Sequence, residues 1–160
     1  MGIKFTEYKE AYFRELSAMI FALYAEDSYG EKMSLGKIRR TIEKLASAPE
    51  RGRILLFISA GVVAGYAIVI YYWSNELGGD IVIIDELYVK PDQRRQGLGR
   101  RFIEYLLNYK KVNVKALQLE VTPENRGAWE FYLRLGFVPL TNRGLMLKTA
   151  KSRQGPAGWK

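Results

Sequence analysis

Apolar side chains in the first fifty residues recur mainly at helical spacing. After a short predicted strand at residues 3–8, apolar positions three and four residues apart predict a helix from Tyr8 to about Ala25. A second helix is predicted after Ser34, whose hydroxyl can cap it, and Pro49 marks its end. This part of the chain therefore predicts the order β-α-α.

From residue 53 onward, the pattern changes to β-branched and aromatic residues. The segments 53–59 and 62–73 flank Ala60-Gly61, which is typical of a hairpin turn. After a polar loop, the apolar run 81–84 continues as a strand to Val89. Pro91 has no backbone N–H to donate, so we expect strand pairing to stop there.

The remaining pattern predicts two helices and three strands. The first helix has an apolar stripe formed by Leu98, Phe102, Ile103, Leu106 and Leu107, and a strand follows at 115–121. The second helix is predicted to begin with Thr122 as its N-cap and Pro123 at its first position, and to end at Gly136. Closing strands are predicted at 137–140 and 144–149. The complete order, β-α-α-β-β-β-α-β-α-β-β, indicates an α+β fold.

Length and composition indicate one ordinary globular domain. The chain has 160 residues, of which 48% are hydrophobic and 26% charged. We assign the domain to residues 1–149 and expect the basic segment 150–160 to be a flexible tail. No apolar run approaches the roughly 20 residues of a membrane span, and no secretory segment is visible, so we expect a cytoplasmic protein that does not enter membranes.

The residue types that are absent restrict the chemistry. The chain contains no cysteine and no histidine, which excludes thiol catalysis and removes the commonest metal ligand and the usual general base. We therefore expect no metal, and acid–base chemistry must use Asp, Glu, Tyr, Lys or water. The net charge is +8, but no dense basic face with stacking aromatics is visible, so nucleic acid is not expected as a partner.

Basic residues gather instead in a strand–loop–helix segment. It contains the motif Arg94-x-x-Gly97-x-Gly99 between the predicted strand and the next helix. A glycine-containing loop at a helix N-terminus favours anions, because free N–H groups and the helix dipole point at the ligand. The segment lacks the Gly-Lys-Ser/Thr end of a Walker A motif and the third glycine of a Rossmann fingerprint. A phosphate-bearing ligand of another kind is therefore indicated.

This motif resembles the pyrophosphate-binding loop of the GNAT superfamily of acyl-CoA-dependent N-acetyltransferases. The segment 124–137 is similar to a second family pattern, Asn-x-x-Ala-x-x-Phe-Tyr-x-x-x-Gly-Phe, beginning at Asn125. Together the two resemblances cover nearly the whole domain. They imply the GNAT fold, a central, mostly antiparallel twisted sheet of about seven strands with splayed central strands, flanked by about four helices.

The resemblance also implies roles for individual residues. Acetyl-CoA is the expected co-substrate, its pyrophosphate held by the loop and its pantetheine arm paired with the backbone of Leu87 and Val89 like an added strand. Tyr132 would be the general acid that protonates the departing thiolate. The implied cofactor-binding set is Leu87, Tyr88, Val89, Arg94, Arg95, Gln96, Gly97, Leu98, Gly99, Arg100, Asn125 and Tyr132.

Two neighbouring carboxylates are candidates for the catalytic base. An alkylammonium ion with a pKa near 10.4 must lose a proton before its nitrogen can attack a thioester. Asp85 and Glu86 end the central strand, where similar enzymes often place their base, and they point to opposite faces of it. We favour Asp85 by a small margin, because residues two apart on a strand share a face, which would place Asp85 on the same face as Leu87 and Val89.

The predicted acceptor is a small cationic amine. The turn between the first two helices contains Glu26, Asp27 and Tyr29, which together with Asp85 and Glu86 form the predicted substrate-binding set. A protein N-terminus or lysine remains an alternative acceptor, distinguished by an open groove, and a non-catalytic acyl-CoA-binding module is a third hypothesis. A homodimer is one expected option, since dimers are common among similar proteins.

Overall fold

The computed structural model describes residues 2–26, 31–109 and 113–149. The chain divides into two compact units, residues 1–125 and 126–160, and each is described by itself. Asp27, Tyr29 and the predicted tail at 150–160 lie outside the described residues.

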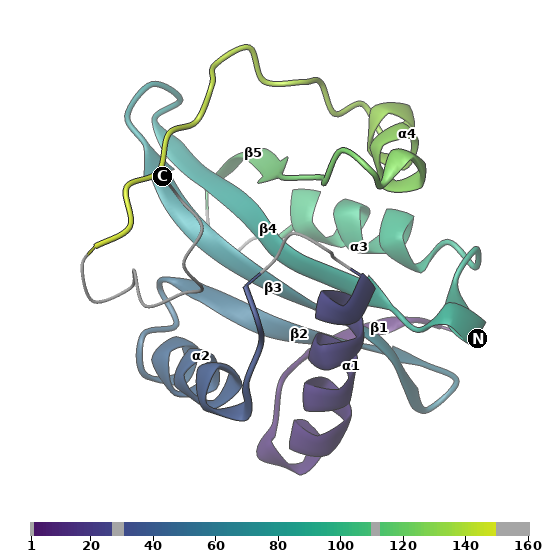
Figure 1. Ribbon diagram of the computed structural model, residues 1–160. Helices are drawn as coiled ribbons and strands as arrows, with labels where there is room; N and C mark the ends of the chain where they lie inside the picture. The colour runs from purple at the N-terminus through teal and green to yellow at the C-terminus, as the bar shows by residue number, and fades with distance from the viewer. Residues whose placement is uncertain (1, 27–30, 110–112, 150–160) are drawn as a thin grey trace. The chain divides into compact units, whose positions relative to one another are not determined.

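The first unit is built around a five-stranded sheet with the order β1-β2-β3-β4-β5 (Figure 1). All neighbouring strands are antiparallel except β4 and β5, which are parallel. The strands are β1 (Lys4–Glu7), β2 (Gly52–Ser59), β3 (Val62–Ser74), β4 (Gly79–Val89) and β5 (Val114–Leu119). The mostly antiparallel sheet and the α+β class are confirmed, but the described chain has five strands, fewer than the seven predicted.

Helices cover both faces of this sheet. The helices of the first unit are α1 (Phe13–Glu26), α2 (Leu35–Ser47) and α3 (Leu98–Leu107), with short 3₁₀ turns at Glu10–Tyr12 and Pro91–Gln93. The second unit contributes α4 (Arg126–Arg134), so the described chain has the four α-helices that were predicted. None of its helices combines the length and the apolar character needed to cross a membrane.

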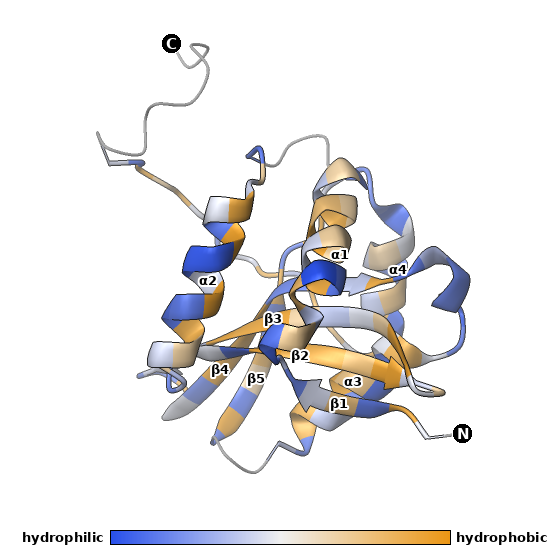
Figure 2. Ribbon diagram, turned by 90° about the horizontal axis from the view of Figure 1, so that it is seen from below, coloured by the Kyte–Doolittle hydropathy of each residue, from blue (hydrophilic) through white to orange (hydrophobic). Residues whose placement is uncertain are grey.

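The side chains of β2 alternate between two apolar layers. Ile54 and Leu56 point to one face, where they pack in a core cluster with α1 and α2 residues such as Leu16 and Ile42. Phe57 points to the other face, where its ring contacts that of Phe102 on α3 at a centroid distance of 4.8 Å. In Figure 2, β2 and β3 are largely orange, whereas α2 carries both orange and blue segments, as expected for an amphipathic helix.

Several element boundaries follow local sequence chemistry. The N–H of Lys37 donates to Ser34 Oγ at 3.3 Å, which confirms the predicted cap of α2. The β2–β3 turn consists of Ala60 and Gly61, both with positive φ, as a two-residue hairpin requires. β4 ends at Val89, immediately before Lys90 and Pro91.

Three predicted boundaries differ from the structure. β5 ends at Leu119, so Val121 is not part of the strand. Thr122 and Pro123 do not begin a helix, because the N–H of Asn125 donates to the Thr122 carbonyl at 3.0 Å and closes a turn before α4. Leu107 is 61% exposed and lies outside the apolar stripe of α3.

The two closing strands are also not found. Gly136, with φ +92°, ends α4 as predicted: its N–H donates to the Leu133 carbonyl, and the N–H of Phe137 donates to the Tyr132 carbonyl. The described residues after this cap form no strand. Their sequence favours a strand, but a strand forms only when its backbone groups pair with a neighbouring strand, and apolar side chains such as Met146 remain 86% exposed.

Candidate active site

The strand β4 has an irregularity at the first of the two candidate carboxylates. Ile84 pairs with Val69 and Glu86 with Ile68, so Asp85 is an extra residue without a partner on β3. Such a bulge bends the strand and changes the direction of nearby side chains. On the other side of β4, pairing with β5 ends at Ile84 and Leu119. The bulge and the end of the parallel pairing therefore coincide.

Beyond this point, residues 86–89 have a described strand partner only on the β3 side. The N–H of Lys90 donates to the Ala64 carbonyl at 2.9 Å, and backbone groups alternate in direction along a strand. The N–H groups of Tyr88 and Glu86 therefore point toward β3, and those of Leu87 and Val89 point to the open edge. This is the backbone arrangement that the pairing of Leu87 and Val89 with an extended ligand requires.

Tyr88 differs from the other residues of the predicted cofactor-binding set. Its side chain is buried in the core cluster beside α1 and α2, and its backbone faces β3. The ring lies 6.3 Å from that of Tyr66. Packing accounts for Tyr88, and neither its ring nor its backbone is presented to the open edge.

The loop after β4 ends at the N-terminus of α3. Gly97 is the N-cap, with φ +77°, and α3 begins at Leu98. The first helical hydrogen bond of this turn runs from the N–H of Arg101 to the Gly97 carbonyl at 3.0 Å, which leaves the preceding N–H groups at the end of the helix without a partner inside it. Arg95 has φ +62°, an unusual value for a residue with a side chain and a sign of local strain.

Most polar side chains of this loop already contact the protein. The guanidinium of Arg94 donates to the Val89 carbonyl at 2.9 Å and to Glu26 Oε1 at 2.7 Å. Gln96 donates to the Asp92 carbonyl, and Arg100 forms an ion pair with Glu104. Arg95 is exposed, and in the described part of the chain it has no carboxylate partner. Of the predicted phosphate ligands, its side chain is therefore the one that needs no rearrangement.

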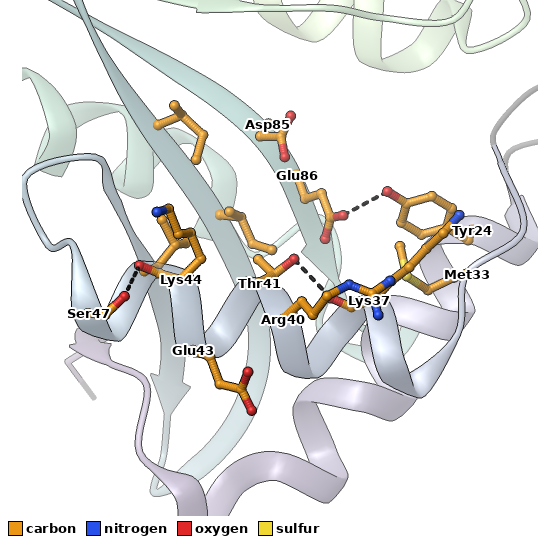
Figure 3. Close-up of a pocket in the computed structure, with 13 residues that line it drawn as sticks. Tyr24, Met33, Lys37, Arg40, Thr41, Glu43, Lys44, Ser47, Asp85 and Glu86 are labelled. Atoms are coloured by element: carbon orange, nitrogen blue, oxygen red, sulfur yellow. Dashed lines mark hydrogen bonds between the residues drawn. The ribbon is translucent and has the colours of Figure 1, made fainter. Parts of the chain in front are cut away.

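A groove of about 940 Å³ lies between α2 and the sheet, entirely within the first unit. Figure 3 shows Asp85 and Glu86 on β4 and, across from them, Arg40, Thr41 and Lys44 on α2. Both candidate bases therefore line one groove. The full lining is Tyr24, Met33, Lys37, Arg40, Thr41, Glu43, Lys44, Leu45, Ser47, Ile68, Ile70, Asp85 and Glu86.

Glu86 is the buried carboxylate of this groove, only 9% exposed. Its Oε1 accepts a hydrogen bond from the hydroxyl of Tyr24 at 2.9 Å, and its Oε2 accepts one from the hydroxyl of Tyr66 at 2.8 Å. Burial raises the pKa of Glu86 above its usual value, and the charge of Asp85 adds to this, whereas the two tyrosine hydrogen bonds oppose it. The result is a fixed carboxylate with an increased affinity for a proton.

Sequence reasoning did not identify Tyr24 and Tyr66 as partners of Glu86. Tyr24 lies on α1 and Tyr66 on β3, 62 and 20 residues away from Glu86. Their spacing in the sequence is that of ordinary core aromatics, so only the pairing of β3 with β4 and the position of α1 could have revealed them.

Asp85 lies in a more open environment. It is exposed, and its pKa is raised first by partial desolvation and then by the negative charge of Glu120. Glu120 follows the last residue of β5, so these two carboxylates stand where β4 and β5 stop pairing. In the described part of the chain, Asp85 accepts no tyrosine hydrogen bond of the kind that fixes Glu86.

Tyr132 belongs to the second unit and is described within it. Its ring packs edge-on against those of Phe131 and Phe137, at centroid distances of 5.0 and 5.3 Å. Burial raises the pKa of Tyr132 to about 12, so the hydroxyl carries its proton at neutral pH. This protonation state is the one that a general acid requires.

Of the predicted acidic acceptor turn, the structure describes Glu26. Its side chain forms an ion pair with Arg94 of the loop that precedes α3, while Asp27 and Tyr29 lie outside the described residues. The groove carboxylates that the structure does bring together are Asp85, Glu86 and Glu43. Within residues 2–26, 31–109 and 113–149, no group of three or more metal-ligating side chains is placed to hold a metal ion.

Comparisons with known sequences agree on the class of protein. Over 65 residues, the chain is 42% identical to an uncharacterised N-acetyltransferase of Methanocaldococcus jannaschii, covering 40% of this chain and 29% of that protein. Over 79 residues, it is 38% identical to the ribosomal protein bS18-alanine N-acetyltransferase of Escherichia coli, covering 46% and 53%. The chain thus matches at most about half the length of these curated relatives.

Solved structures share the fold at low sequence identity. A possible acetyltransferase from Clostridium difficile superposes with a TM-score of 0.79 at 19% identity, covering 92% of this chain and 97% of that one. AAC(6′)-Iy, in complex with the bisubstrate analogue CoA-S-monomethyl-acetylneamine, superposes with a TM-score of 0.69 at 15% identity, covering 93% and 99%.

The family profile described as Acetyltransferase (GNAT) family matches residues 14–137. This match includes nearly all of α1, together with α2, the strands β2 to β5, the loop before α3, and α4. The chain belongs to the GNAT acetyltransferase family.

Proposed function

We propose that this chain transfers the acetyl group of acetyl-CoA to a primary amine by direct attack in a ternary complex. The observation that carries the proposal is Glu86, a buried carboxylate fixed by two tyrosine hydroxyls in a groove beside the open edge of β4. A binding module would have no need for a buried carboxylate with a raised pKa at this position.

The cofactor end of the proposal rests on three features of the first unit. The outward N–H groups of Leu87 and Val89 can pair with the pantetheine arm, and the outward N–H of Leu87 can also donate to the acetyl carbonyl. The N-terminus of α3 and the exposed side chain of Arg95 offer N–H groups and positive charge to the pyrophosphate. Asn125 is proposed to bond the pantetheine by family resemblance.

The chemistry requires proton transfer at two atoms. The acceptor ammonium gives a proton to Glu86, directly or through water, and the freed nitrogen lone pair attacks the thioester carbonyl carbon. The C–S bond then breaks as the amide forms, and the departing sulfur takes a proton from a general acid, which regains a proton, directly or through water, when the nitrogen loses its second proton. We assign that role to Tyr132, whose burial keeps it protonated. A raised pKa makes Glu86 a stronger base than an ordinary glutamate.

Our first candidate acceptor is a small amine that arrives as a cation and is attracted by Asp85 and Glu86. A protein N-terminus is the second candidate, because the groove is bordered by the exposed α2 residues Arg40 and Lys44 and has room for several residues of a peptide. The similarity to a ribosomal protein bS18-alanine N-acetyltransferase supports the same alternative.

The direct test is turnover of acetyl-CoA with a panel of small amines and peptides, followed as amine-dependent release of free CoA and by the mass of the product. We expect at least one primary amine to be acetylated. Tight acetyl-CoA binding without turnover on any amine would instead support a non-catalytic acyl-CoA-binding module.

We expect the affinity for acetyl-CoA to fall as salt is added, because exposed basic side chains such as Arg95 contribute to phosphate binding. Calorimetry should show several-fold weaker binding at about 1 M salt, where the Debye length is about 3 Å, than at about 0.1 M, where it is about 10 Å. Equal affinity at both salt concentrations would show that charge does not contribute.

Replacing Tyr132 by Phe should lower turnover by about 10²-fold or more, the usual contribution of a general acid. The ring contacts with Phe131 and Phe137 remain, so folding and acetyl-CoA binding should be preserved. Tyr105→Phe, which also removes a hydroxyl from an aromatic cluster, is the matched control and should not change turnover. Undiminished chemistry in Tyr132→Phe under single-turnover conditions would assign the residue to packing.

A further inference from the structure

The α2 wall of the groove carries a row of positive charge. Lys37, Arg40 and Lys44 follow one another at spacings of three and four residues, so they lie on one face of the helix, and all three line the groove together with Thr41. Glu43 is the single acidic residue that α2 contributes to the lining. Across the groove, β4 presents Asp85 and Glu86 (Figure 3). The groove therefore has a negative side and a mainly positive side.

Two of these cations have no ion-pair partner among the described residues. The Nζ of Lys37 donates to the Lys32 carbonyl at 2.8 Å and lies 3.4 Å from Glu31 Oε2. In contrast, the ion pairs of the described chain include neither Arg40 nor Lys44. Four residues apart on a helix, they are separated by about 6 Å along its axis, so one anionic group can contact both.

We propose that the acceptor is a primary amine that also carries an anionic group, a carboxylate or a phosphate, bound by Arg40 and Lys44. The inference rests on the proposed function, since it places the amine of the same molecule at Glu86. The guanidinium of Arg40 suits such an anion, because its donors match the two oxygens of a carboxylate. Between the two ends, Ile68 and Ile70 of β3 offer an apolar surface to the connecting carbons.

The positive charges on α2 argue against an acceptor that carries several ammonium groups and no anionic group. Its second ammonium group would lie against Arg40 and Lys44, and like charges in a partly enclosed groove repel each other. The acidic turn on which the predicted cationic acceptor was based is represented among the described residues by Glu26, which is paired with Arg94. An amine with an anionic group satisfies both sides of the groove.

Matched acceptors test this inference. The assay uses the full chain with saturating acetyl-CoA and compares three amines as acceptors: 4-aminobutyrate, n-butylamine and putrescine. At the end away from the reacting amine, they carry mainly a carboxylate, a methyl group and an ammonium group, respectively. We expect kcat/KM for 4-aminobutyrate to exceed that for each of the others by at least tenfold. Two peptide amines, one beginning Ala-Glu-Glu and one Ala-Gln-Gln, form a second arm, and a preference for the acidic peptide over 4-aminobutyrate would identify a protein as the source of the anion.

The variant Arg40→Gln/Lys44→Gln should lose the preference for the carboxylate through a KM at least tenfold higher, while kcat/KM for n-butylamine stays within about twofold. Arg14→Gln/Arg51→Gln removes the same charge from exposed positions away from the groove and is the control for net charge. The inference would be overturned if kcat/KM for putrescine equalled or exceeded that for 4-aminobutyrate, or if Arg40→Gln/Lys44→Gln kept the preference for the carboxylate. Neither result would contradict the proposed function. Absence of turnover with every acceptor would overturn the proposed function itself.

Discussion

Replacing Gly97 by Val is expected to abolish measurable acetyl-CoA binding while the protein stays folded. Gly97 has φ +77° at the N-cap of α3, and no atom lies within 4 Å of the position that a Cβ would take. The new side chain would therefore occupy space in front of the helix N-terminus, where the phosphates are proposed to bind. Losing even one charge-assisted hydrogen bond costs about 1.5–3 kcal/mol, so calorimetry should show the dissociation constant rising about 100-fold or more.

The chain contains a closely matched control for this substitution. Gly61 in the β2–β3 turn has φ +82°, and its Cβ position is equally open. The variant Gly61→Val should lose a comparable amount of stability in thermal unfolding, because both sites force a side chain into a left-handed conformation. Its affinity for acetyl-CoA should remain that of the wild type. Binding that survives in Gly97→Val would show that the loop does not hold the phosphates.

Replacing Glu86 by Gln is expected to lower turnover by about 10²- to 10⁴-fold, the range in which general bases contribute. The amide keeps the size of the side chain and can still accept a hydrogen bond from Tyr24 or Tyr66, so folding should be preserved. Turnover of the wild type should rise with pH through the pKa of Glu86, because only the carboxylate can accept a proton. Since burial raises that pKa, this acidic limb should lie above the range of an ordinary glutamate.

The pH–rate profile also separates the two neighbouring carboxylates. Glu86→Gln should lose the acidic limb, whereas Asp85→Asn should keep it, because Asp85 is exposed and lacks the tyrosine partners of Glu86. Glu50→Gln, in the exposed turn between α2 and β2, controls for the loss of one surface carboxylate. If Asp85→Asn loses the acidic limb instead, the catalytic base is Asp85, the residue that the sequence pattern favoured.

The elements that were predicted correctly are those whose signal is local. The cap at Ser34, the turn at Ala60 and Gly61, and the ends of β4 and α4 at Val89 and Gly136 each depend on residues a few positions apart. Local hydrogen bonding and backbone preference are sufficient to specify them. The start of α3 just after Gly97 is a local feature of the same kind, since a glycine with φ +77° forms its N-cap.

Features that depend on distant partners could not be predicted. The choice between Asp85 and Glu86 depends on a bulge, which shows only in the pairing of β4 with β3, and on Tyr24, which α1 brings from 62 residues away. The positive wall of the groove was hidden for the same reason, because residues on α2 read as the solvent face of an amphipathic helix. The segment after Gly136 illustrates the opposite error, since strand propensity was present without a described strand partner.

The open edge of β4 has a consequence for how this protein tolerates variation. At Leu87 and Val89 the proposed contribution to the cofactor comes from backbone N–H groups, which every residue except proline possesses. Alanine scanning would therefore report these positions as dispensable, although they border the ligand. Glu86, between Asp85 and Leu87, is proposed to act through its side chain, so replacing that side chain should not be tolerated. Variation among natural relatives should thus alternate along this strand, with the permissive positions marking the cofactor side.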